Sequence, residues 1–195
     1  MVILGRIKEG VVYLATDTRE LYGAVKKQYL EEFHYKIRHK EGGLLVGIAV
    51  KKPCVRQAIA AYDDMFTLDK NGDLTKEHIV KEIVPKLRQV CEQEGFLPRE
   101  KEQVPYIEAE IVLAHKGKMF TIRRDFTVVR HAECAVVGPV GAFALYAVSQ
   151  ESDDVNGQLL KGLQVATEHA NSVAPPYLFI NTKELTYQLI GGDVQ

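Results

Sequence analysis

The sequence predicts an α+β fold in which two antiparallel β-sheets face each other and a pair of helices covers each outer surface, a four-layer αββα sandwich. Three observations predict it. Strand-like and helix-like runs follow one another in the order sheet, two helices, sheet, two helices, sheet. The helices come in pairs between blocks of strands, which indicates layers. No flexible linker or shift of composition divides the 195 residues, so we expect a single domain over residues 1–195.

The first block consists of strand-like runs. Residues 2–8 and 11–16 are rich in β-forming residues and enclose a turn at Glu9 and Gly10, which predicts a hairpin. Two further strands are expected at residues 33–37 and 43–49, and the second is apolar enough to be buried on both faces. We therefore expect the N-terminal third of the chain to form a sheet.

Two helices follow this block. Apolar residues recur at helical spacing over residues 53–66, after a proline that is tolerated at a helix start. Residues 69–73 predict a turn, and Thr75 is a candidate N-cap for a second helix that ends near Gly95. Its inner face holds Ile79, Ile83, Leu87, Val90 and Cys91. We expect Pro85 to kink this helix.

The second half of the chain repeats the succession of strands and helices. The expected elements are strands at residues 106–114, 119–123 and 126–137, helices at residues 138–149 and 155–171, and closing strands at residues 177–180 and 185–190. Asp153 or Asp154 can cap the second helix of this half, and the two prolines at 175–176 end it.

Composition excludes several classes of function. Lys and Arg number 25 against 26 Asp and Glu, so no overall field favours nucleic acid or an anionic membrane as a partner. No stretch approaches the length of a membrane span, and the charged first ten residues lack the apolar run of a secretory signal. Cys54, Cys91 and Cys134 lack the spacing of a disulfide framework or a zinc site. We expect a cytoplasmic protein that uses no cofactor and no metal.

Two polar segments resemble metal sites without meeting their requirements. In a calcium loop that begins at Asp69, the sixth position would be Leu74, where a glycine is needed. His131, Glu133 and Cys134 fall in one expected strand, and strand alternation places Cys134 on the face opposite the other two. We expect a loop before a helix cap in the first segment and a structural histidine in the second.

Four segments carry a resemblance to a known family. They are the opening hairpin with Gly10 and Asp17, the buried strand at 44–49 that leads into a helix, the run at 136–144, and the closing run at 179–185. In this order they resemble proteasome β-type subunits, and most closely the HslV-type peptidase of bacterial ATP-dependent proteases. The likeness covers most of the chain. It implies the N-terminal-nucleophile (Ntn) hydrolase fold, a homo-oligomer such as a ring, and an ATPase or protease-assembly partner.

The resemblance also assigns positions in a catalytic site. In that family the nucleophile is the hydroxyl of an N-terminal threonine, whose own α-amino group is the base. Met1 stands at this position, and its removal would expose Val2, which lacks a hydroxyl too; we expect no self-processing propeptide. Asp17 and Lys36 match the family's acid and lysine beside the nucleophile. Gly47 matches the glycine whose backbone N–H faces the oxyanion.

A second hydroxyl-bearing position is lost as well. The family's helper serine falls on Pro139, which has neither a hydroxyl nor an N–H. Residues 50–53, Val-Lys-Lys-Pro, stand where the family has small residues and an acid, which changes the charge and shape of the substrate groove. The sequence therefore predicts an inactive or degenerate threonine-peptidase homologue that acts as a structural or regulatory subunit of an oligomer.

Other interpretations remain open on the sequence alone. Lys36 has an alternative as a surface strand lysine, Asp17 as a turn residue, and Gly47 as a small residue in a crowded sheet. The alternative function is an active threonine-type endopeptidase or another Ntn amidohydrolase in ATP-dependent protein degradation, with Thr16, Thr18 or a cysteine as nucleophile. A third is a binding module whose degenerate pocket holds a small ligand.

Overall fold

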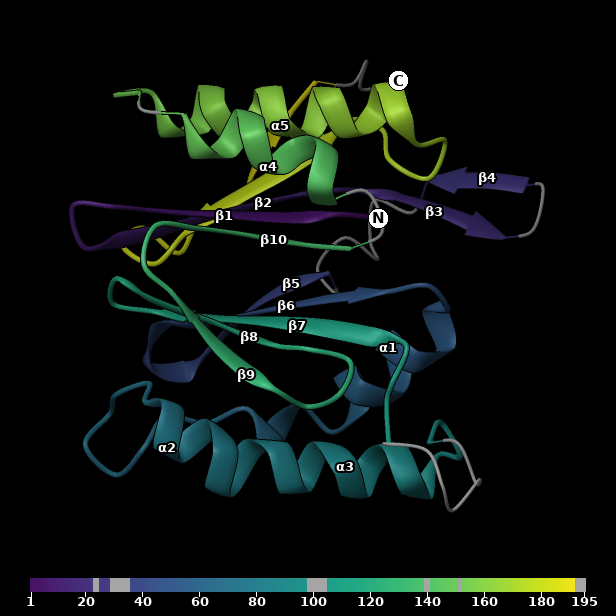
Figure 1. Cartoon of the computed structure of the whole chain (residues 1–195), viewed down its shortest axis with the longest axis vertical. Coiled ribbons are helices and arrows are strands. Elements are labelled where there is room, and N and C mark those ends of the chain that lie inside the picture. Colours follow the sequence, from purple (N-terminus) through teal and green to yellow (C-terminus); the bar gives the residue numbers. More distant parts are fainter. Residues whose placement is uncertain (23–24, 29–35, 98–104, 139–140, 151, 192–195) are drawn as a thin grey trace.

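The computed structural model describes residues 1–22, 25–28, 36–97, 105–138, 141–150 and 152–191. Its two five-stranded sheets face each other, and helices cover both outer surfaces (Figure 1). All strand pairs in the two sheets are antiparallel. The predicted αββα sandwich is therefore confirmed.

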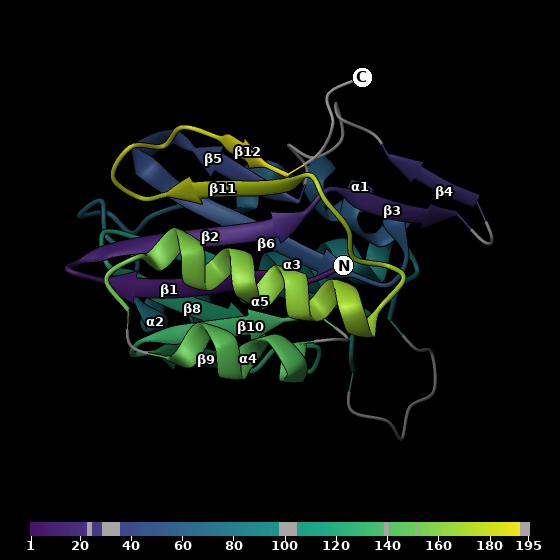
Figure 2. The ribbon, with the colours of Figure 1, turned by 90° about the horizontal axis from the view of Figure 1, so that it is seen from above.

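The first sheet has the strand order β10-β1-β2-β11-β12. These strands are Cys134–Val137, Ile3–Lys8, Val11–Asp17, Tyr177–Asn181 and Gln188–Ile190, in the same order. Helices α4 (Gly141–Ser149) and α5 (Val155–His169) lie side by side over its outer face (Figure 2). Buried residues of α5, among them Leu159 and Leu163, pack on Leu4 and Phe179 of the sheet.

The second sheet has the order β5-β6-β7-β8-β9. These strands are Ile37–Lys40, Leu44–Val50, Ala109–His115, Lys118–Ile122 and Val128–His131. Its outer face is covered by α1 (Pro53–Ala61), the single turn α2 (Lys76–His78) and α3 (Val84–Gln93). The larger hydrophobic core lies between the two sheets and extends to these helices, and all seven residues of β6 are buried in it.

The strands of the N-terminal third divide between the two sheets, so the expectation that they form one sheet is wrong. The hairpin of β1 and β2 belongs to the first sheet, and β5 and β6 belong to the second, where β6 pairs with β7. Between them lies a hairpin of β3 (Arg19–Tyr22) and β4 (Val25–Gln28), which was not predicted and projects from the sandwich (Figure 1). The strand expected at 33–37 begins at Ile37, and residues 33–35 lie outside the described part of the chain.

The run at 126–137 is two strands that belong to different sheets. The strand β9 pairs with β8, and β10 pairs with β1, so the chain crosses from one sheet to the other between His131 and Cys134. His131 hydrogen-bonds through Nε2 to the hydroxyl of Thr121. Within the described residues no group of three or more His, Cys, Asp and Glu side chains lies close enough to hold a metal ion.

Two predicted helix caps are present in the structure. The Thr75 hydroxyl accepts a hydrogen bond from the His78 N–H at 3.2 Å, and the Asp154 carboxylate accepts one from the Gly157 N–H at 2.8 Å. Asp154, and not Asp153, is therefore the cap of α5. The loop before Thr75 is held by Asp69, whose carboxylate accepts two backbone N–H groups of the same loop.

Two helices differ from their predicted form. The helix expected over 53–66 ends at Ala61 and is followed by a 3₁₀ turn, η3 (Asp63–Met65). Before Pro85 the chain forms a π-helical segment, η4 (Ile79–Ile83), because a proline lacks an N–H and crowds the preceding turn. No helix in the described ranges is long and apolar enough to cross a membrane.

Candidate active site

Asp17 is the centre of a buried polar cluster at the end of β2. Its side chain is fully buried, and its carboxylate oxygens accept hydrogen bonds from two directions. Oδ2 accepts one from Lys36 Nζ at 3.0 Å, and Oδ1 accepts one from the Val2 N–H at 3.0 Å. The turn interpretation of Asp17 is therefore incomplete, because its carboxylate joins the first residues of the chain to Lys36.

Lys36 is buried as well, with 1% of its surface exposed. Besides the Asp17 carboxylate, its ammonium group donates to the backbone oxygens of Asp17 and Arg19, both at 2.7 Å. Three acceptors satisfy the three N–H bonds of an ammonium group, which is the condition for keeping such a charge away from water. A surface lysine with its head in solvent is excluded. Burial lowers the pKa of Lys36, and the charge of Asp17 opposes that shift.

The terminal amine of Met1 lies beside this ion pair. Because Ile3 pairs with Thr16 in the sheet, the two residues before Ile3 lie along the end of β2, where the Val2 N–H donates to Asp17. The amine donates to the backbone oxygen and the hydroxyl of Ser172, both at 3.2 Å. Burial lowers the pKa of the amine below its ordinary value; Asp17 opposes this shift and Lys36 adds to it. A lowered pKa favours the neutral amine, the form that can accept a proton.

Arg56, a charged residue of α1, is buried near Met1. Only 1% of its surface is exposed, and its Nη1 lies 3.8 Å from Met1 Sδ. Burial lowers its pKa to about 10, and the charge of Asp17 opposes the shift. The sequence contained the signal, since Arg56 precedes the buried Ile59 and Ala60 by three and four residues and shares their helix face.

Ser172 is the other functional candidate that sequence reasoning missed. It lies in the loop between α5 and β11, 171 positions from Met1 in the sequence. No motif or periodic pattern surrounds it, and only the packing of the loop against the start of β1 brings it to the amine. Its hydroxyl lies next to the terminal amine. The backbone nitrogen of Ser172 is in a peptide bond, however, so the hydroxyl and the amine belong to different residues.

Gly47 lies in the middle of β6, paired with Ile37 and Val112. A Cβ at this position would stand 3.1 Å from Ile3 Cδ1, so the glycine permits the close approach of the two sheets. This contact favours the interpretation as a small residue in a crowded sheet. An oxyanion role for its N–H stays a prediction.

Pro139 lies outside the described residues, but the residue before it is placed. The Gly138 N–H donates to Glu110 Oε2 at 3.0 Å, and its φ of 108° lies in a region that favours glycine. A Cβ on Gly138 would stand 2.5 Å from the backbone oxygen of Met1. Gly138, which directly precedes the predicted helper position, therefore lies against the backbone of Met1.

Three of the alternative nucleophiles, Thr16, Thr18 and Cys91, have surroundings that disfavour the role. The Thr16 hydroxyl donates to the Val2 oxygen at 2.8 Å, and the Thr18 hydroxyl donates to the Pro176 oxygen at 2.8 Å. Burial raises the pKa of the Cys91 thiol to about 11, which disfavours its thiolate. The two hydroxyls therefore have structural partners. A nucleophilic role for Cys54, which is exposed, or for Cys134, which is half-buried, stays a prediction. The geometry thus brings together an amine, an acid and a lysine, but it places no hydroxyl on the residue that bears the amine.

Solved structures with the same fold are known, although no protein-family model and no curated protein sequence matches the chain. BPH of Thiobacillus denitrificans in complex with epoxomicin has a TM-score of 0.72 and 19% identity, with 95% of this chain and all of that chain covered. Eukaryotic HslV from Trypanosoma brucei has a TM-score of 0.61 and 16% identity, covering 93% and 98%. Anbu, the ancestral β-subunit, from Yersinia bercovieri has a TM-score of 0.68 and 13% identity, covering 99% and 88%. Together with the sandwich topology, these likenesses show that the chain has the Ntn fold of the HslV and proteasome type.

Proposed function

We propose that this chain is a catalytically silent proteasome-like subunit, which acts by assembling into a homo-oligomer and not by hydrolysing peptides. The observation that carries the proposal is the position of Met1. Its amine lies beside the Asp17–Lys36 pair, yet its side chain is a thioether that contacts Arg56. A thioether has no proton to give up, so a neighbouring base cannot turn it into a nucleophile for acyl transfer.

Neither of residues 1 and 2 supplies the missing group. Whichever of residues 1 and 2 carries the terminal amine, its side chain is a thioether or an isopropyl group. The nearest hydroxyls, those of Thr16 and Ser172, belong to residues whose backbone nitrogens are in peptide bonds, and Thr16 donates to Val2. Among the described residues, the amine-plus-hydroxyl arrangement of a threonine peptidase therefore has no counterpart in this cluster.

The test is a gain of function. Met1→Thr/Pro139→Ser, released from a cleavable leader so that residue 1 carries a free amine, restores both predicted hydroxyls. We expect no hydrolysis of fluorogenic peptides by the parent chain and a rise of roughly 10²-fold over its background in the variant. Adding Lys36→Met should abolish the gain, with Lys81→Met, which changes an exposed lysine, as the matched control.

Two results would contradict the proposal. Hydrolysis by the parent chain that Lys36→Met removes would mean that an unrecognised nucleophile works in this cluster. A parent chain that is monomeric by light scattering at micromolar concentration would remove the subunit role. An ATPase or protease-assembly partner and a cytoplasmic location belong to the same proposal, and both are expected from the sequence alone.

A further inference from the structure

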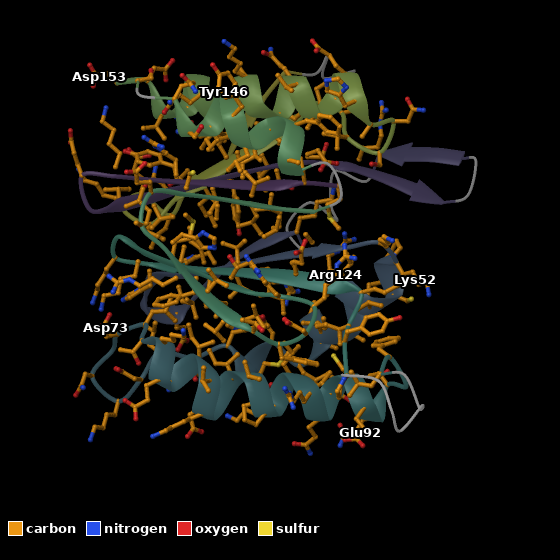
Figure 3. All side chains as sticks on the ribbon, viewed as in Figure 1. Lys52, Asp73, Glu92, Arg124, Tyr146 and Asp153 are labelled. Atoms are coloured by element: carbon orange, nitrogen blue, oxygen red, sulfur yellow. The ribbon has the colours of Figure 1, made fainter. Side chains whose placement is uncertain are left out.

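Four exposed arginines gather at one edge of the second sheet. They come from α3, from the turn between β8 and β9, and from β9 itself: Arg88, Arg123, Arg124 and Arg130. Figure 3 shows Arg124 at the same end of the second sheet as Lys52. Among the residues that the structure describes, none of the four arginines has an ion-pair partner. The whole chain has a net charge of −1, so the positive charge at this edge is local.

The turn between β8 and β9 has a defined hydrogen-bond pattern that holds two of the arginines. The Arg123 N–H donates to the Thr127 oxygen at 2.9 Å, and the Phe126 N–H donates to the Arg123 oxygen at 2.8 Å. The Asp125 carboxylate accepts the Thr127 N–H at 3.0 Å. The guanidinium of Arg88 lies over the Phe126 ring, 4.7 Å from its centroid. Helix α3 therefore brings a further guanidinium to the same turn.

The strand β9 is an edge strand, and its backbone is open on one side. Within the second sheet it pairs with β8 alone. Bonded and non-bonded residue pairs alternate along an antiparallel ladder, and the bond between Arg123 and Thr127 sets this alternation. Val128 and Arg130 therefore turn their backbone N–H and C=O groups away from β8. Val128 is buried, whereas Arg130 is exposed and presents both its backbone groups and its guanidinium at the open edge.

The positive charge extends along β9. Three residue steps separate Thr127, at the end of the turn, from Arg130, which is about 10 Å along a strand. Burial lowers the pKa of His131, a hydrogen bond to the backbone of Cys134 opposes the shift, and the charge of Arg123 adds to it. The field of Arg123 thus reaches the last residue of β9. We call the four arginines and the open side of β9 the arginine edge.

We propose that the arginine edge binds an extended acidic segment of a partner protein, which adds to β9 as a further strand. Charge complementarity points to acids, because a carboxylate accepts two parallel N–H bonds from one guanidinium. The open backbone points to an extended peptide, because a strand supplies N–H and C=O groups at the spacing that a sheet edge leaves unpaired. Acids about three residues apart reach both Arg130 and the arginines of the turn.

A peptide fits this edge better than a nucleic acid does. Asp125 lies among the arginines of the turn, Glu133 follows β9 by two positions, and both are exposed. These carboxylates repel the continuous row of phosphates of a nucleic acid, whereas a peptide can place its acids only where the arginines lie. A sugar-phosphate backbone also has no N–H group to donate to the open carbonyl of Arg130.

The test measures binding of a fluorescein-labelled peptide of five Glu-Thr repeats by fluorescence anisotropy. The parent chain should bind this probe with a Kd on the order of 10 µM at about 50 mM salt, and more weakly at about 500 mM, since salt screens exposed charges. Arg124→Gln/Arg130→Gln should weaken binding about tenfold. The matched control is Lys161→Gln, which removes an exposed cation of α5 and should leave the Kd within about twofold of the parent.

A second probe tests the addition of a strand. A labelled peptide of five Glu-Pro repeats keeps the charge of the first probe, but half of its residues lack an N–H, and proline disfavours a paired strand. The parent chain should bind it at least about tenfold more weakly than the Glu-Thr probe. Equal binding of the two probes would mean that the edge attracts acids without pairing with them, which would overturn the inference.

Three further results would overturn the inference. They are an absence of binding of the Glu-Thr probe at about 1 mM protein, an equal loss of binding in Lys161→Gln, and tighter binding of a labelled ten-nucleotide oligothymidylate than of the peptide. The double variant changes two exposed side chains and should unfold in urea at the same concentration as the parent chain. If it unfolds earlier, Arg130→Gln alone takes its place in the comparison.

The arginine edge goes beyond the proposed function and is tested apart from it. The anisotropy measurement needs neither hydrolysis nor self-association. A failure to bind the probe leaves the silent site and the subunit role intact. A parent chain that hydrolyses peptides, or that stays monomeric, contradicts the proposed function and leaves the arginine edge intact.

Discussion

The buried pair of Asp17 and Lys36 is the feature at the residue scale on which the site depends. Replacing Lys36 by methionine keeps the volume and removes the charge, so it leaves the Asp17 carboxylate buried without its cation. We expect the free energy of unfolding in urea to fall by about 3–5 kcal/mol. Lys81→Met removes the exposed partner of Glu77 and should cause little change. Equal stability of the two variants would mean that the pair is solvated.

The amine of Met1 gives a second prediction at this scale. Its pKa is lowered by burial, while the Asp17 charge raises it. Asp17→Asn removes the opposing charge, so the amine should titrate at a still lower pH. The measurement is the pH dependence of acylation of the terminal amine, followed by mass spectrometry with exposed lysines as the reference. An amine that titrates at its ordinary value in both proteins would contradict the described surroundings.

The same shift has a consequence for stability. The unfolded amine keeps its ordinary pKa of 8.0, and the folded amine titrates lower. Just below pH 8.0 the unfolded chain therefore binds more protons, and the free energy of unfolding contributed by this group rises with pH across that window. As the pH falls through the folded pKa, this part of the stability is lost. Urea unfolding between pH 6 and 8.5 measures this effect. The control chain carries two extra residues before Met1, so that the nitrogen of Met1 is in a peptide bond and does not titrate.

At the scale of the element, the caps give the sharpest expectation. Asp154 accepts the Gly157 N–H at the start of α5, and the adjacent Asp153 is exposed and pairs with Lys8 at the surface. Asp154→Ala should lower the stability by about 1 kcal/mol, through the loss of a helix cap. Asp153→Ala should change it little. The reverse order of effects, measured by urea unfolding, would show that the cap is assigned to the wrong residue.

The elements that sequence could predict are those with a strong local signal. The buried strand β6, the caps at Thr75 and Asp154, and the turn at Glu9 and Gly10 all have such signals, and the structure has them. The hairpin of β3 and β4 has none, because its strands are four residues long and rich in charged residues. The ends of the elements were predicted least well. The first helix ends at Ala61, although apolar residues continue at helical spacing as far as Phe66.

At the scale of the whole molecule, the layers and the hairpin of β1 and β2 were predictable, but the long-range strand partners were not. The helices occur in two pairs, and each pair predicts one outer layer, regardless of which strands it covers. The pairing of β1 with β10 joins residues more than 120 positions apart, and no local pattern encodes it. The same holds for the site. Asp17 and Lys36 could be matched from a resemblance, whereas Ser172 reaches the Met1 amine only through the packing of the complete sandwich.

The proposed function requires that the cluster around Met1 keep its acid, lysine and amine but hold no nucleophile. Its most direct test uses epoxomicin, the compound bound to BPH of Thiobacillus denitrificans. The intact mass of the parent chain after incubation with excess epoxomicin should be unchanged. Met1→Thr/Pro139→Ser, with a free amine on residue 1, should gain the mass of one epoxomicin molecule. An adduct on the parent chain that Lys36→Met prevents would contradict the account.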